Sequence, residues 1–77
     1  MDEVRELTFG EKAVGLTFNP SGNLDVETVK VAYAAVIDLL HEERLSIPNG
    51  EKTRLLSVAI TEAQTAQMWA VKAFTWK

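Results

Sequence analysis

The segment from residue 57 to residue 77, SVAITEAQTAQMWAVKAFTWK, most constrains the fold. Its alanines recur at steps of three and four, so they lie on one side of an α-helix as a strip that another helix can approach closely. The strip consists of Ala59, Ala63, Ala66, Ala70 and Ala73, and the large apolar residues around it are Met68, Trp69, Val71, Phe74 and Trp76. Such a helix needs two partners. The chain folding back on itself provides one, and we expect a second copy or a ligand to provide the other.

The composition agrees with self-association. A chain of 77 residues makes at most one domain, and a domain of this size is often marginal by itself. It has no cysteine and one histidine, His41, so neither a disulfide, a metal site nor a cofactor is expected. The hydrophobic content of 47% is high for so small a chain, which points to oligomerisation as the route to stability.

The net charge of −3 argues against DNA or RNA polymers as partners, because these require a basic field. It still allows a compact anionic ligand held by a few lysine or arginine side chains. The first ten residues, MDEVRELTFG, lack the apolar core of a secretory signal, and no apolar run is long enough for a membrane span. We therefore expect a cytoplasmic protein.

The pattern predicts a single all-α domain: an N-terminal arm over residues 1–22, a helix over 24–45 and a helix over 51–76. Residues 2–7 could form a short helical turn, and residues 9–23 are expected to be irregular because they hold three of the four glycines. Asn23 or Asp25 is the predicted N-cap of the first long helix. Its apolar face is formed by Val26, Val29, Tyr33, Val36, Ile37 and Leu40. Residues 46–50, SIPNG, break the helices, so we expect an antiparallel hairpin.

The irregular segment has two interpretations. Phe9, Leu16 and Phe18 could anchor an arm that packs over the hairpin. Alternatively the segment is a binding loop, with an aromatic ring for stacking and with Asn19, Ser21 and backbone N–H groups for an anion near the helix start.

An enzymatic function is not supported by the sequence. His41 lies beside two glutamates, which a solvated helix face explains better than a general base. Glu62 and Gln64 have no nucleophile at a matching spacing, and no phosphate-binding loop or metalloprotease motif is present.

Several residues are candidates for anion binding, each with a simpler alternative. Lys30, one turn before Tyr33, could contact a phosphate or extend into solvent. Arg54 lies near the positive end of its helix, where an anion would suit it, but an ion pair with Glu51 or Glu43 also explains it. Ser57 and Thr61 could be hydroxyls at a close helix contact. Trp69 and Trp76 are expected to pack in an interface rather than to stack on a ligand. A membrane anchor at this end of the chain is not expected, because two nearby lysines are too few for a lipid surface.

Three stretches resemble the phage anti-CBASS sponge family, whose helical-hairpin domain is shared with sponges that counter the Thoeris defence. They are FGEKAVGLTFNPSGN at 9–23, residues 29–38, and SVAITEAQTAQMWAVKAF at 57–74. The family carries an aromatic–His/Asn–…–Pro loop, a basic residue in the first helix, an arginine, a Ser-x-Ala-Leu-Thr run and a Met-Trp-Ala motif. The similarity covers nearly all of the chain beyond residue 8.

The resemblance implies a compact hexamer that sequesters cyclic oligonucleotide signals of host immune cyclases in the infected cell's cytosol, without cleaving them. Cyclic dinucleotides such as 3',3'-cGAMP would bind between protomers, and cyclic trinucleotides at separate sites. Phe18 falls at the family's base-stacking tyrosine, Lys30 at or near its phosphate contact and Arg54 at a contact for the trinucleotide, whereas Glu62 replaces an alternative basic position. The ligand-binding residues expected are Phe9, Phe18, Asn19, Pro20, Ser21, Lys30, Tyr33, Arg54, Ser57 and Thr61.

Two other functions are kept as alternatives. One is a helical adaptor that binds a host protein through Phe74, Trp76 and neighbouring apolar groups. The other, less favoured, is a phosphodiesterase, which would need a metal or a base that the sequence does not supply.

Overall fold

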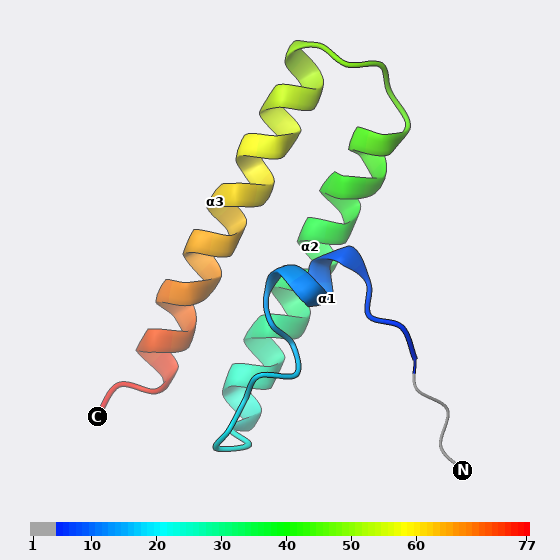
Figure 1. Cartoon of the computed structure of the whole chain (residues 1–77). Coiled ribbons are helices and arrows are strands. Elements are labelled where there is room, and N and C mark those ends of the chain that lie inside the picture. Colours follow the sequence, from blue (N-terminus) through cyan, green and yellow to red (C-terminus); the bar gives the residue numbers. More distant parts are fainter. Residues whose placement is uncertain (1–4) are drawn as a thin grey trace.

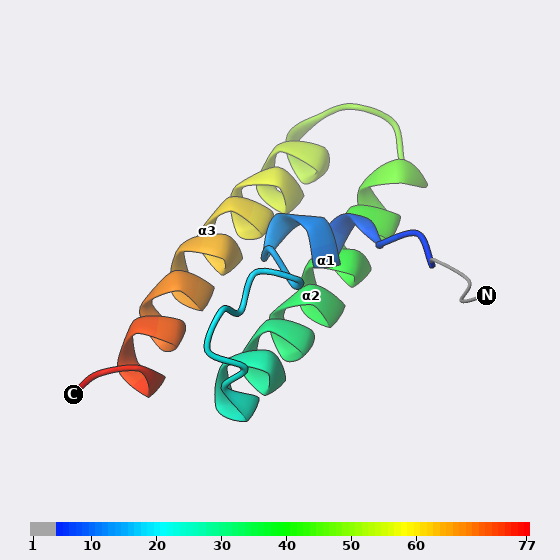
Figure 2. The same ribbon diagram turned by 60° about the horizontal axis from the view of Figure 1, so that its bottom comes forward.

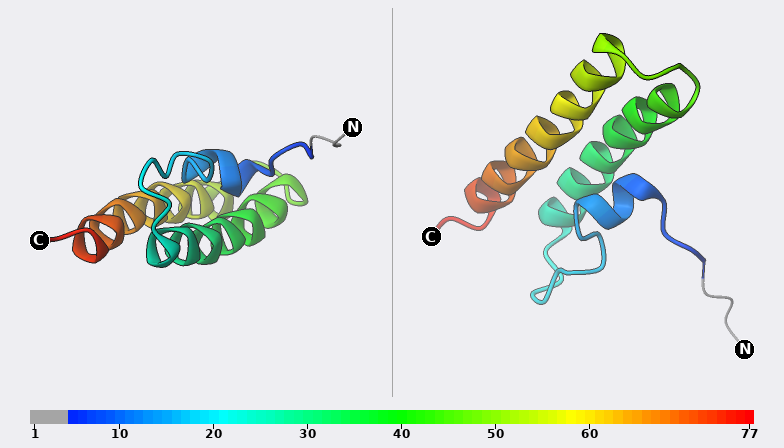
Figure 3. Two further views of the ribbon diagram at one scale, coloured as in Figure 1. Left: turned by 90° about the horizontal axis from the view of Figure 1, so that it is seen from below. Right: turned by 45° about the horizontal axis from the view of Figure 1, so that its top comes forward.

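The computed structural model describes residues 5–77 and contains three helices in that range, as Figure 1 shows. Helix α1 spans Phe9–Ala13, α2 spans Leu24–Leu45 and α3 spans Glu51–Phe74. Helices α2 and α3 form an antiparallel hairpin, and α1 lies across one face of it (Figure 3). The predicted all-α hairpin with a short N-terminal helical arm is confirmed. Helix α3 ends two residues before the predicted bound.

The N-terminal arm differs in detail from the prediction. Residues 2–4 of the predicted turn lie outside the described residues, and residues 5–7 are not helical. The expectation that 9–13 is irregular was wrong, because α1 begins there. Thr8 and Glu11 form a capping box: the Glu11 N–H donates to Thr8 Oγ1 at 3.1 Å and the Thr8 N–H donates to Glu11 Oε1 at 2.9 Å. The Thr-x-x-Glu spacing that signals this start was present in the sequence.

Helix α1 docks on α2 through Gly10. The Gly10 N–H donates to Asp38 Oδ1 at 2.7 Å, and Thr8 Oγ1 donates to Asp38 Oδ2 at 2.7 Å. A Cβ atom at Gly10 would lie 2.2 Å from the Ala34 carbonyl oxygen. The backbones therefore come close enough here that only glycine fits.

The core lies between the two long helices and below α1. Its buried members are Val14, Ala34, Ile37 and Ile60, and Ile37 is fully buried. Ala13, Leu16, Tyr33, Leu40 and Ala63 pack against them. Val36, predicted on the apolar face, is instead 48% exposed, whereas Lys30 on the same helix is buried. The helix periodicity was thus correct, but the buried face is rotated toward Lys30 and Ala34.

The loop between α1 and α2 is held by local hydrogen bonds. Figure 2 shows residues 14–23 leaving α1 and running along the hairpin to the start of α2. Asn23 is the N-cap, as predicted, because its side-chain oxygen accepts from the N–H groups of Asp25 and Val26. Gly15 and Gly22 both have a φ of 63°, in the left-handed region that favours glycine.

The folded chain is a thin slab, with principal extents of 42 × 38 × 12 Å. Many large apolar side chains therefore face outward. On the two long helices they include Leu24, Val31, Val36, Leu39, Leu45, Leu55, Val58, Met68, Trp69 and Phe74. Of the alanine strip, Ala63 packs against the core, while Ala66 and Ala73 remain exposed. Within residues 5–77, no helix combines the length and apolarity needed to cross a membrane.

Candidate functional site: a groove above Lys30 and Gln67

A groove runs between the α1–α2 loop and the second half of α3. Its volume is about 470 Å³. It is lined by Lys12, Ala13, Val14, Gly15, Phe18, Lys30, Gln67, Met68 and Val71. The groove brings together two of the residues predicted to bind a ligand, Phe18 and Lys30.

Lys30 is buried at the groove, with 5% of its surface exposed. Its ammonium donates to the carbonyl oxygens of Gly15, at 2.9 Å, and Phe18. The side chain thus reaches the Phe18 loop, and the alternative of a solvated lysine is wrong. An ammonium carries three N–H donors, and these two hydrogen bonds use two of them. Lys30 therefore holds the loop and lines the groove.

Phe18 presents its ring to solvent beside this charge. The residue is 72% exposed, and the Lys30 nitrogen lies 5.6 Å from the ring centroid. A cation at this distance is attracted to the ring face. An exposed aromatic ring next to a buried ammonium offers a stacking surface and an anion contact within one groove.

Gln67 was missed by the sequence analysis. It is 5% exposed and lies on α3 seven positions after Ile60, while Lys30 lies on α2 seven positions before Ile37. In an antiparallel hairpin, Gln67 and Lys30 are therefore at the same level, two helical turns beyond the isoleucines, with Ala34 and Ala63 between the two levels. The seven-residue spacing from Ile60 was the sequence signal that Gln67 is buried. It was overlooked because a glutamine in a helix is usually exposed to solvent.

Phe9 and Tyr33 lie elsewhere. Phe9 stacks on His41 with ring centroids 3.9 Å apart, and the Arg44 guanidinium lies 5.5 Å from the Phe9 ring. Arg44 is also 2.8 Å from His41 Nδ1. The interpretation of His41 as part of a solvated face was wrong, because the start of α1 covers it. Tyr33 packs against the core cluster.

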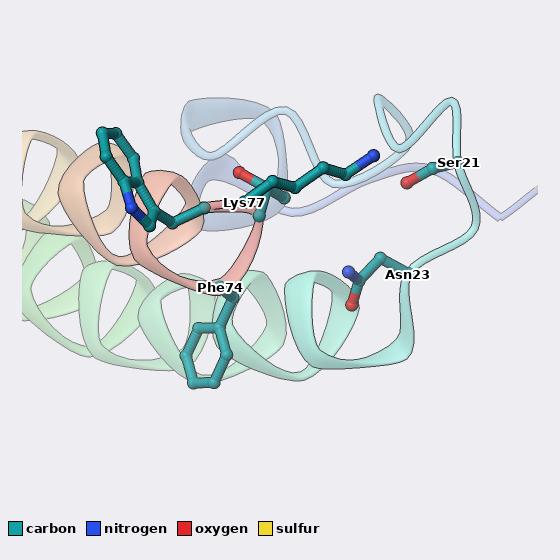
Figure 4. Close-up of a pocket in the computed structure, with 6 residues that line it drawn as sticks. Ser21, Asn23, Phe74 and Lys77 are labelled. Carbon is teal, nitrogen blue, oxygen red and sulfur yellow. The ribbon is translucent and has the colours of Figure 1, made fainter.

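Asn19, Pro20 and Ser21 form the turn before α2. The Asn19 side chain accepts from the Asn23 N–H at 3.2 Å and donates to the Asn23 carbonyl at 2.9 Å. Ser21 lines a second cleft of about 490 Å³ with the last residues of the chain. Figure 4 shows the Lys77 side chain extending toward Ser21, with the Phe74 ring pointing away. Of the predicted loop residues, Phe18 thus lines the groove and Ser21 lines the second cleft, whereas Asn19 and Pro20 line neither.

Arg54, Ser57 and Thr61 lie toward the loop end of the hairpin, away from the groove. Arg54 pairs with Glu51 at 2.6 Å, one of the two partners that the sequence suggested, and this hydrogen bond lowers the pKa of the Glu51 carboxyl. Glu43, the other suggested partner, pairs with Lys52 at 2.8 Å. Ser57 Oγ accepts from Arg44 at 3.0 Å, whereas Thr61 is exposed.

Residues 11–75 match the hairpin domain of the Acb2/Tad1 family. The chain belongs to this family. Its members are the anti-CBASS and anti-Thoeris sponges, which bind cyclic nucleotides and are not enzymes. No curated protein and no solved structure matches the chain.

The matched part includes Phe18, Lys30, Arg54 and Gln67, whereas Arg5, Thr8 and Gly10 precede it. The contacts that start α1 and bring it against Asp38 therefore depend partly on residues ahead of the family's hairpin domain. Among the residues that the structure describes, no three His, Cys, Asp or Glu side chains gather where they could hold a metal ion.

Proposed function

We propose that the chain sequesters cyclic dinucleotides such as 3',3'-cGAMP in the Phe18–Lys30 groove. In the cytosol of an infected bacterium, this withholds the signal from CBASS effectors. The observation that carries the proposal is the pairing of an exposed aromatic ring with a buried ammonium that has an N–H donor left over. Family membership supports it independently.

The chemistry of the ligand fits these groups. A cyclic dinucleotide has two flat bases and two phosphates, so it needs stacking surfaces and a few cations. Phe18 stacks on one base, and the third N–H of Lys30 donates to a phosphate oxygen. A single buried lysine is sufficient for a compact ligand, whereas a polymer would need a basic field that a chain of net charge −3 lacks.

The proposed assembly is a homohexamer of hairpins. A slab 12 Å thick leaves large apolar side chains on both long helices uncovered, and burial against further copies removes them from water. A pocket on a two-fold axis would present Phe18 and Lys30 twice, matching a ligand that is itself nearly two-fold symmetric. The exposed alanines Ala66 and Ala73 support close approach of a second copy.

Cyclic trinucleotides are proposed to bind at a second site, with contacts from Arg54, Ser57 and Thr61. Arg54 precedes Gln67 by 13 positions on α3, a separation of roughly 20 Å along the helix. The two proposed sites are therefore separate on one chain, and we expect cyclic di- and trinucleotides to bind without competing.

Isothermal titration with 3',3'-cGAMP tests the proposal. We expect tight binding, recovery of intact ligand after heating, and a loss of about 5- to 150-fold in affinity for Phe18→Ala, because stacking one base is worth about 1–3 kcal/mol. Thr17→Ala is the control, since Thr17 is the exposed neighbour of Phe18 in the same loop and does not line the groove. Unchanged affinity in Phe18→Ala, with the elution volume of the wild type, would remove Phe18 from the site.

The alternative function is a helical adaptor for a host protein. The exposed Trp69, Phe74 and Trp76 side chains favour it, because they could cover a partner's apolar surface. This function predicts no affinity for 3',3'-cGAMP or cyclic triadenylate, so the same titration separates the two.

A further inference from the structure

Among residues 5–77, Gln67 is the one buried polar side chain at the groove that makes no hydrogen bond at all. Two other polar or charged side chains among residues 5–77 are buried: Lys30 is bonded to Gly15 and Phe18, and Thr53 Oγ1 is bonded to Gly50. Gln67 makes no side-chain hydrogen bond within this described range. Every fully enclosed side-chain nitrogen or oxygen there has a partner, so the Gln67 amide atoms must reach open space. The space that Gln67 lines is the groove.

The Gln67 amide meets the open groove, where water or a ligand can hydrogen bond to it. Burying an amide without a hydrogen bond is unfavourable, and replacing it by an apolar group of the same shape is often neutral. A methionine or leucine would continue the apolar spacing from Ile60. The glutamine therefore suits a binding role better than a packing role.

We propose that the Gln67 amide hydrogen bonds to the edge of a nucleobase in the groove and favours adenine. This inference rests on the proposed function. Phe18 covers the flat face of a base, so discrimination between bases must come from a group that meets the base edge. The amide offers a donor and an acceptor side by side. Both edges of adenine present the complementary pair, N6 with N1 and N6 with N7. Guanine presents such a pair on its Watson–Crick edge, O6 with N1–H, but only acceptors on its N7–O6 edge, so the amide can read either edge of adenine and one edge of guanine.

Cyclic di-AMP and cyclic di-GMP titrated into the wild type and Gln67→Met test this assignment. Methionine keeps the length and apolar stem of the side chain but lacks the amide. We expect cyclic di-AMP affinity to fall by about 5- to 150-fold, the effect of losing a bidentate base contact, and cyclic di-GMP affinity to fall less. Gln64→Met is the matched control, because Gln64 lies one turn earlier on α3 and does not line the groove.

Three outcomes would overturn the inference while leaving the proposed function intact. One is wild-type binding of both ligands with unchanged affinities in Gln67→Met. The second is an equal loss of affinity for both ligands, and the third is a loss accompanied by a changed elution volume; either of these would assign Gln67 to packing. If the wild type binds neither ligand, nor 3',3'-cGAMP or cyclic triadenylate, the proposed function fails first and the inference fails with it.

Discussion

Two layers of side chains between α2 and α3 occupy equivalent positions but differ in chemistry. In the first, Ile37 and Ile60 face each other and are almost completely buried. In the second, seven residues toward the open end of the hairpin, the positions are taken by Lys30 and Gln67. Both layers are buried to a similar degree, yet only the second lines a groove.

With the proposed site at the second layer, the hairpin assigns stability to one layer and binding to the other. The isoleucine layer removes apolar surface from water, which is the main source of folding free energy. The Lys30–Gln67 layer gives up this gain and places a charge and an amide where a ligand can reach them. Polar groups in a core are retained at a cost, so their clustering at one level supports the binding site proposed there.

The largest effect is expected from breaking the apolar layer. Ile37→Ala should reduce the free energy of unfolding by about 2–5 kcal/mol, because it removes buried methylene groups and leaves a cavity. Urea denaturation at fixed chain concentration measures this. Val36→Ala, at a position 48% exposed, is the control and should cost far less. If Val36→Ala reduces the free energy of unfolding as much as Ile37→Ala does, further copies of the chain must cover the face of α2 that carries Val36.

The next largest loss of stability is expected from a substitution in α1, the helix that lies across one face of the hairpin. Gly10→Ala places a Cβ atom 2.2 Å from the Ala34 carbonyl, a backbone atom that cannot move aside alone. We expect a loss of about 1–3 kcal/mol and faster hydrogen exchange of the α1 amides. Gly50→Ala is the matched control, since a Cβ there has no neighbour within 4 Å. Equal stability of the two variants would show that α1 does not depend on this close approach.

Breaking the polar layer should affect two properties at once. Lys30→Met removes the hydrogen bonds to the carbonyls of Gly15 and Phe18, so we expect a loss of about 1–2 kcal/mol, limited by the better burial of methionine. Ligand affinity should fall as well.

Phe18→Ala, by contrast with Lys30→Met, should reduce ligand affinity without reducing the free energy of unfolding, because the ring is 72% exposed. A Lys30→Met variant that is fully stable and loses only affinity would show that Lys30 serves the ligand alone.

The sequence predicted the hairpin well and the site only in part. Apolar spacing, the Asn23 cap and the 46–50 break define α2 and the start of α3 because these signals are local. Lys30 and Gln67 could not be placed together from sequence, since their proximity depends on the rotation of each helix and on the register between them. Lys30 was expected either to extend into solvent or to contact a phosphate. Its hydrogen bonds to the carbonyls of Gly15 and Phe18 depend on the path of the loop, which the sequence does not reveal. Thr8 and Glu11 show the opposite case, a local signal that was present and overlooked.

The smallest effect tests whether the α1 cap contributes separately from the two layers. Two hydrogen bonds lower the pKa of the Glu11 carboxyl below its usual value of 4.5: the larger effect comes from the Arg5 side chain and the smaller from the Thr8 N–H. A lowered pKa in the folded state means that this contribution is complete above pH 4.5 and is lost as the pH falls through the lowered pKa. The Val14 N–H donates to the Gly10 carbonyl. Its protection against hydrogen exchange should therefore decrease on acidification from pH 6 to pH 3.

Glu11→Gln should remove this part of the pH dependence. Glu51→Gln, whose carboxyl pKa is also lowered but lies at the far end of the hairpin, should leave Val14 protection unchanged. Equal effects of both variants on Val14 would mean that α1 opens only when the whole hairpin unfolds, so that the groove and the isoleucine core form one cooperative unit.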